Sequence, residues 1–135
     1  MKIPINTPIV GKEEISVVTS IIKKGEFTSS VNHGGKYVQD FEKSVSSFVN
    51  AKYTVAVNSG TAALQAALYA LNIKQGDEVL IPSFTFVATA NSVLSTGAKP
   101  VFVDILKDNF TMDPEQLEKK ITKKTKAIVP VHLYG

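Results

Sequence analysis

The residues best suited to binding chemistry lie in the turn 58–61, whose sequence is Asn-Ser-Gly-Thr. The β-branched segment before it, beginning at Val55, is typical of a buried strand, and the Ala/Leu-rich segment after it is typical of a helix. Such a turn directs backbone N–H groups and the positive end of a helix dipole at one point, which suits a phosphate. Ser59 and Thr61 add hydroxyl groups, and Gly60 lets the backbone approach a ligand closely. An ordinary capped helix after a strand fits residues 55–64 equally well.

Aromatic side chains occupy the loop that follows the next strand-like segment, 78–81. Phe84 and Phe86 lie there beside Ser83 and Thr85. An aromatic ring at the carboxyl end of a strand can stack on a flat heteroaromatic ring, although the residue type alone favours a core position for Phe86. A phosphate-binding turn and a stacking ring in adjacent loops predict a site for a phosphorylated planar cofactor.

Several other kinds of site are disfavoured by missing motifs. The chain has no Gly-x-Gly-x-x-Gly, no Gly-Lys-Ser/Thr phosphate loop and no Gly-x-Ser-x-Gly nucleophile turn. It has no cysteine, and its two histidines, His33 and His132, lie far apart in sequence. We therefore expect neither disulfides nor a metal site.

The net charge is +3, and all 15 basic residues are lysines. A chain without arginine and without a clustered basic face is a poor candidate for reading nucleic acid, so we expect no nucleic-acid partner. No apolar run approaches the roughly 20 residues that span a bilayer, and no signal peptide is evident. These features predict no membrane partner and a cytoplasmic location.

Apolar periodicity predicts two helices, a polar loop between them and then a regular alternation of strands and helices. The predicted helices of the first part cover residues 11–24 and 36–49, and the alternation comprises strand 53–57, helix 60–72, strand 78–81, helix 85–95, strand 99–105, helix 113–121 and strand 126–131. This order favours an α/β fold, a three-layer α/β/α arrangement with a mostly parallel sheet, whose ligands bind beyond the carboxyl ends of the strands.

The domain organisation follows from the same pattern. We expect a single domain over 1–135, with an arm and helices in 1–50 and the phosphate-binding β-α-β-α-β-α-β part in 51–135. A sheet of this type rarely stops directly after a strand without a covering helix. The sequence is therefore expected to be cut off after Gly135.

Five phrases resemble the DegT/StrS sugar aminotransferases, which are fold-type I enzymes dependent on pyridoxal phosphate. They are NSGTAAL at 58–64, GDEV at 76–79, PSFTFVATAN at 82–91, GAKPVFVD at 97–104 and VHLYG at 131–135. They occur in the same order and at the same spacing as in that family, over nearly the whole chain. The resemblance implies the N-terminal part of the large domain of a fold-type I transferase.

The resemblance also implies roles for individual residues. The family's Ser-Gly-Thr turn binds the cofactor phosphate, which assigns cofactor binding to Ser59, Gly60, Thr61 and Ala62, and an aromatic residue matching Phe86 stacks on the pyridine ring. Residues 28–35 match a region near the active-site entrance and receive no role. For His132, in the last phrase, we expect a hydrogen-bonded structural histidine.

Two catalytic groups of the family lie beyond the point that matches Gly135: the lysine that holds the cofactor as a Schiff base and the aspartate that pairs with its pyridinium nitrogen. No lysine here matches that position, and we expect all lysines to lie on the surface. The chain thus resembles part of an aminotransferase that acts on a nucleotide-linked keto-sugar with an amino-acid donor, with no catalytic residue of its own and no activity alone.

Three interpretations stay open. The chain is a fragment, from a shortened gene or an expressed piece; or it works with a second chain that supplies the aspartate and lysine; or it is a non-catalytic phosphate-binding or interaction module. The fragment interpretation is favoured. An exposed sheet edge and an uncovered apolar face should recruit a partner, and the family is dimeric, so we expect a homodimer.

Overall fold

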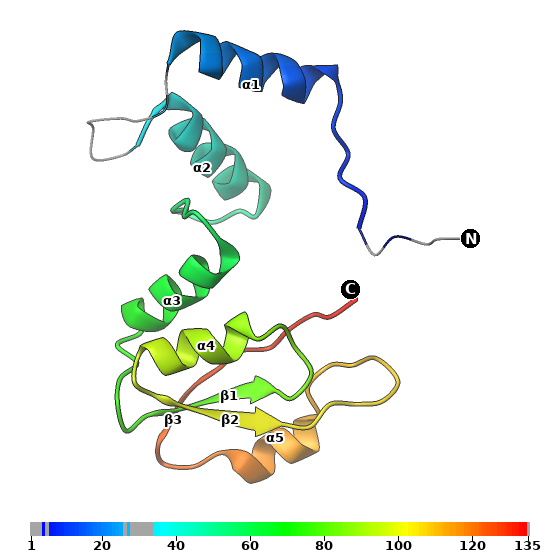
Figure 1. Cartoon of the computed structure of the whole chain (residues 1–135). Coiled ribbons are helices and arrows are strands. Elements are labelled where there is room, and N and C mark those ends of the chain that lie inside the picture. Colours follow the sequence, from blue (N-terminus) through cyan, green and yellow to red (C-terminus); the bar gives the residue numbers. More distant parts are fainter. Residues whose placement is uncertain (1–3, 5, 26, 28–33, 135) are drawn as a thin grey trace. The chain divides into compact units, whose positions relative to one another are not determined.

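The computed structural model describes residues 4, 6–25, 27 and 34–134 of the 135-residue chain. The chain divides into two compact units, Met1–Ala56 and Val57–Gly135, each with its own helices or strands (Figure 1). No helix in the described ranges is both long enough and apolar enough to cross a membrane.

The first unit contains two helices, α1 (Lys12–Lys24) and α2 (Lys36–Phe48), which confirms the two predicted helices. α1 begins after Gly11, whose N–H donates to the Glu14 carboxylate at 2.6 Å. It ends at Gly25, which adopts the left-handed conformation (φ 68°) typical of a helix C-cap. Neither helix buries a residue, and Phe48 of α2 is 91% exposed.

The second unit is a parallel three-stranded sheet covered by helices. Strands β1 (Glu78–Pro82), β2 (Lys99–Val103) and β3 (Thr125–Ile128) lie in the order β2-β1-β3, and β1 pairs in parallel with both neighbours. Helices α3 (Gly60–Ala70) and α4 (Ala88–Ser95) contact each other, α4 contacts β1 and β2, and α5 (Pro114–Lys120) contacts β2. Helices α4 and α5 cover opposite faces of the sheet (Figure 1). The predicted α/β fold with a parallel sheet is confirmed.

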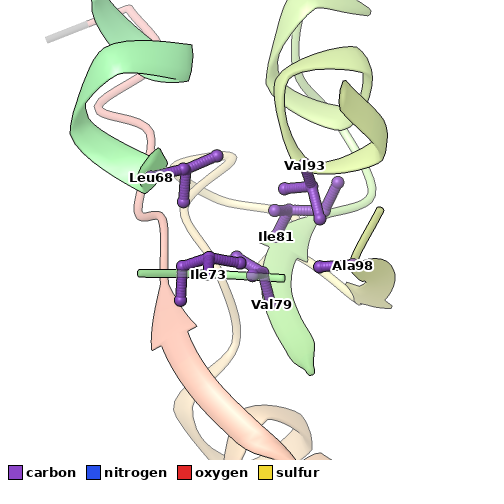
Figure 2. Close-up of a cluster of buried hydrophobic side chains, with 6 residues drawn as sticks. All are labelled: Leu68, Ile73, Val79, Ile81, Val93 and Ala98. Carbon is purple, nitrogen blue, oxygen red and sulfur yellow. The ribbon is translucent and has the colours of Figure 1, made fainter. Parts of the chain in front are cut away.

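The core of this unit lies between the sheet and helices α3 and α4. Val79 and Ile81 are fully buried on β1 and, being two residues apart, share one face of the sheet. Figure 2 shows these two side chains gathered with four from neighbouring helices and loops: Leu68, Ile73, Val93 and Ala98. The central strand is thus anchored on the face that also carries α4.

Local signals in the sequence set the bounds of several elements. Asp113 caps α5, its Oδ1 accepting the Glu115 N–H at 2.8 Å, and Pro114 occupies the first helical position. Gly97 follows α4 with φ 79°, a conformation that favours glycine. β3 ends at Ile128, ahead of Pro130, which has no N–H for a strand ladder.

The strand predicted over 53–57 is wrong: among the described residues these five form no strand pairing. Tyr53 and Val55 are each 78% exposed, and the Ala56 N–H donates to the Glu42 side chain at 2.8 Å. The β-branched composition supplies strand propensity, but propensity makes a strand only where a neighbouring strand offers the ladder.

Glu78, at the amino end of β1, interacts with residues at the amino ends of β2 and β3. From the start of β1, its Oε2 accepts a hydrogen bond from the Thr122 hydroxyl at 2.7 Å, in the turn before β3, and its Oε1 lies 3.6 Å from Nζ of Lys99 on β2. The Thr122 hydrogen bond, with the charge of Lys99 in support, holds the pKa of Glu78 below its ordinary value of 4.5. Because the folded state has the lower pKa, ionised Glu78 stabilises the fold above pH 4.5, and this contribution is lost as the pH falls through the folded pKa.

Replacing Glu78 by glutamine should therefore lower the free energy of unfolding near neutral pH, with a difference from wild type that shrinks as the pH falls below 4.5. Urea unfolding at a series of pH values measures this. Thr122→Val should reduce this pH dependence of the free energy of unfolding, because it removes the hydroxyl that donates to Glu78. Thr122→Ser keeps a hydroxyl and should preserve the pH dependence. A Glu78→Gln curve parallel to wild type at every pH would contradict the assignment.

Candidate functional site

A pocket of ≈ 740 Å³ opens in the second unit, beyond the carboxyl ends of β1 and β3. Three segments line it: the start of α3, the turn between β1 and α4, and the chain after β3. Their lining residues are Gly60, Thr61, Ala63 and Leu64; Thr85, Phe86, Ala88 and Thr89; and Val129, Pro130, Val131, His132 and Leu133. This is the end of a parallel sheet at which ligands of α/β proteins bind.

The first turn of α3 presents hydrogen-bond donors to the pocket. Ser59 is the N-cap, and its Oγ accepts the Ala62 N–H at 3.1 Å. The N–H groups of Gly60 and Thr61 have no partner among the described residues, and both residues line the pocket. Two unpaired amides at a helix N-terminus, with the Thr61 hydroxyl beside them, suit an anion.

Gly60 itself is consistent with a bound group at this point. A Cβ added there would meet no atom within 4 Å, and its φ lies outside the left-handed range. Neither packing nor backbone conformation within the described chain therefore requires glycine. A glycine at this position leaves the backbone open to close approach by a ligand.

Phe86 supplies the aromatic wall. Its side chain is 76% exposed and lines the pocket from the turn between β1 and α4. The alternative of a core position for Phe86 is therefore wrong. Behind it, the hydroxyl groups of Thr85 and Thr89 lie 2.9 Å apart, and both residues line the same wall.

The structure thus brings three of the five sequence-predicted site residues to one pocket, namely Gly60, Thr61 and Phe86. Ser59 and Ala62 lie outside the lining and build the helix cap behind it. Cofactor binding by these five residues stays a prediction. Residues 28–33, which include His33 and most of the segment matched to the active-site entrance, lie outside the described residues, as does Gly135.

His132 differs from its prediction. A hydrogen-bonded structural role was expected, but the imidazole has no hydrogen-bond partner among the described residues, is exposed and lines the pocket. The position of His132 after β3 could have indicated a place in the pocket, because ligands of parallel sheets bind at the carboxyl ends of the strands. Thr89, also in the lining, carried no such signal in the sequence.

No lysine of the described chain lines this pocket. The arrangement can therefore bind an anion at the α3 N-terminus and contact a flat ring at Phe86, and the imidazole of His132 also lines the pocket. The described residues of the pocket supply no amine that could attack a carbonyl group.

Comparison with known proteins agrees with the motif resemblance. The spore coat polysaccharide biosynthesis protein SpsC of Bacillus subtilis is 47% identical over 133 residues, which cover 98% of this chain and 33% of SpsC. GDP-perosamine synthase of Vibrio cholerae is 39% identical over 98% of this chain and 35% of its own length. The PLP form of the putative sugar aminotransferase Spr1654 from Streptococcus pneumoniae superimposes with a TM-score of 0.88 at 38% identity, over 98% of this chain and 33% of that one.

The chain thus spans about a third of the length of these relatives. Residues 8–135 match the model of the DegT/DnrJ/EryC1/StrS aminotransferase family. The resemblance seen in the five sequence phrases is confirmed, and the chain belongs to the DegT/DnrJ/EryC1/StrS aminotransferase family.

Proposed function

We propose that this chain is the N-terminal part of a pyridoxal-phosphate-dependent sugar aminotransferase and that its pocket takes the phosphate and ring of the cofactor. One observation supports this most directly: a helix start with two unpartnered backbone amides and an exposed aromatic ring line the same pocket at the carboxyl edge of the sheet. These are the two features that a phosphorylated flat ring requires.

The residues present fit this group. The N–H groups of Gly60 and Thr61 and the Thr61 hydroxyl would hold the phosphate, and the exposed face of Phe86 would orient the ring. When bound, the cofactor supplies the electron sink for amino-group transfer. The part played by this chain is to bind and orient: it fixes the phosphate end at α3 and excludes water from one ring face.

We propose further that the chain alone does not transaminate. The absence of lysine from the described pocket lining supports this, because amino-group transfer needs a lysine amine at the cofactor. The whole protein would transfer an amino group from an amino-acid donor to a keto-sugar that is linked to a nucleotide. The names of two relatives support this proposal in different parts: GDP-perosamine synthase names a nucleotide-linked sugar, and 3-oxo-glucose-6-phosphate:glutamate aminotransferase names a keto-sugar phosphate and an amino-acid donor.

A homodimer is the proposed assembly. Phe102 on β2 and Ile128 on β3, the two outer strands of the described sheet, are 49% and 42% exposed. Apolar side chains on the outer strands of a sheet favour association. A non-catalytic binding module that works with a second chain is the alternative, since it too would lack a pocket lysine.

The test is a titration of the purified chain with pyridoxal phosphate and, separately, with pyridoxal, followed by ligand absorbance or fluorescence. The phosphate should strengthen binding by about tenfold or more, because charge-assisted hydrogen bonds contribute about 1.5–3 kcal/mol. Phe86→Ala should weaken the binding of both ligands by about fivefold through loss of stacking.

Phe84→Ala is the matched control, because Phe84 lies two residues away, is 44% exposed and is absent from the pocket lining. It should leave both affinities unchanged. Equal affinity for pyridoxal phosphate and pyridoxal would contradict the phosphate site. A Phe86→Ala variant that binds both ligands like wild type would contradict the stacking role.

A further inference from the structure

The turn that carries Phe86 is held by two hydrogen bonds that both involve Thr89. The Thr89 N–H donates to the Phe86 carbonyl oxygen at 3.0 Å, and the hydroxyl groups of Thr89 and Thr85 lie 2.9 Å apart. Thr85 and Thr89 therefore bracket Phe86 in sequence and are joined across it in space. The backbone that carries the ring is closed into a short loop.

Little else in the described chain fixes the Phe86 ring. The ring is 76% exposed, so packing does not hold it. α4 begins after Val87, which makes no capping hydrogen bond through its side chain. By contrast, the nearby Phe84 ring contacts Phe110, with centroids 5.7 Å apart. The direction of the Phe86 side chain therefore depends on the backbone of its own turn.

Burial favours the hydrogen bond between the hydroxyl groups of Thr85 and Thr89. Thr89 is 6% exposed, and a buried hydroxyl without a hydrogen-bond partner is unfavourable, so the pairing with Thr85 is favoured. Both threonines and Phe86 line the pocket, where a ligand would meet the ring. A hydrogen bond of modest strength can thus decide the orientation of an otherwise unsupported aromatic side chain.

We propose that the Thr85–Thr89 hydroxyl pair positions Phe86 for stacking on a flat ligand in the pocket. The inference rests on the proposed function for the identity of that ligand. The threonines act through Phe86 and are positioning residues. The hydroxyl groups carry the effect, and the methyl groups contribute packing that other side chains can replace.

The test compares Thr89→Val, which keeps the shape and removes the hydroxyl, with Thr89→Ser, which keeps the hydroxyl. Pyridoxal phosphate is the probe for affinity, and the aromatic NMR signals of Phe86 report the ring in the ligand-free chain. Thr89→Val should weaken binding about fivefold, the effect of one hydrogen bond, and alter the Phe86 signals. Thr89→Ser should restore both readouts to the wild-type values.

Thr96→Val is the matched control. It removes a hydroxyl at the other end of α4, where Thr96 Oγ1 donates to the Val93 carbonyl oxygen at 2.7 Å, away from the pocket lining. It should lower the melting temperature without changing affinity or the Phe86 signals. If Thr89→Val leaves both readouts unchanged, or Thr89→Ser alters them equally, the inference is wrong. If the wild-type chain does not bind pyridoxal phosphate, the proposed function fails, and the Phe86 signals alone decide the positioning role.

Discussion

Replacing Gly60 by aspartate should weaken the binding of pyridoxal phosphate by about a hundredfold and leave the affinity for pyridoxal nearly unchanged. A carboxylate at this position would lie against the site proposed for the phosphate, and like charges in contact cost several kcal/mol. The fold should tolerate the change, because an added Cβ meets no atom within 4 Å and the backbone at Gly60 is not left-handed. A negative charge in the first turn of α3 also complements the helix dipole.

Gly60→Asn is the matched control for this prediction, since asparagine has nearly the shape of aspartate without its charge. It should weaken pyridoxal phosphate binding far less than Gly60→Asp does. Both variants should keep the circular dichroism spectrum and melting temperature of the wild type. Equal losses in the two variants would mean that steric blockage explains the effect, and unchanged binding in Gly60→Asp would place the phosphate elsewhere.

Much of the second unit could be predicted because its elements carry their own boundary signals. Asp113 and Pro114 define the start of α5, and Gly97 follows the end of α4. The strand β1 is a short apolar run that the sheet buries on both faces, as its sequence indicates. In each case the residues that determine the structure lie within or next to the element itself.

The segment 53–57 has strand-like residues but forms no strand in the described chain. Its composition resembles that of β1, but strand formation depends on a partner that is distant in sequence. In the described sheet, β1 already has a neighbour on each side, β2 and β3. A local pattern predicts the tendency to form a strand and leaves the pairing undetermined.

The candidate site was predictable to the extent that it lies at strand ends. Gly60, Thr61 and Phe86 were expected in loops at one edge of the sheet, and the structure places them around one pocket. The pairing of Thr85 with Thr89 was not foreseen, because it depends on how the chain turns into α4. The same holds for His132, whose exposure depends on the path of the chain after β3.

Replacing the buried Ile81 by alanine should lower the free energy of unfolding of the second unit by about 2–5 kcal/mol. Ile81 is fully buried on the central strand and packs in the cluster with Val93 of α4 (Figure 2). Truncation leaves a cavity between β1 and α4, the helix that follows the turn carrying Phe86. Urea unfolding followed by circular dichroism measures the loss.

Ile128→Ala is the control for Ile81→Ala, because it makes the same chemical change on β3 at a side chain that is 42% exposed. There the removed atoms already contact water, so the loss should stay below about 1 kcal/mol. A similar loss in both variants would mean that strand propensity, rather than burial against α4, governs the stability of the sheet. A larger loss for Ile81→Ala locates the stabilising contact in the buried cluster between β1 and α4. Because α4 follows the turn that carries Phe86, that variant should also weaken pyridoxal phosphate binding where Ile128→Ala does not.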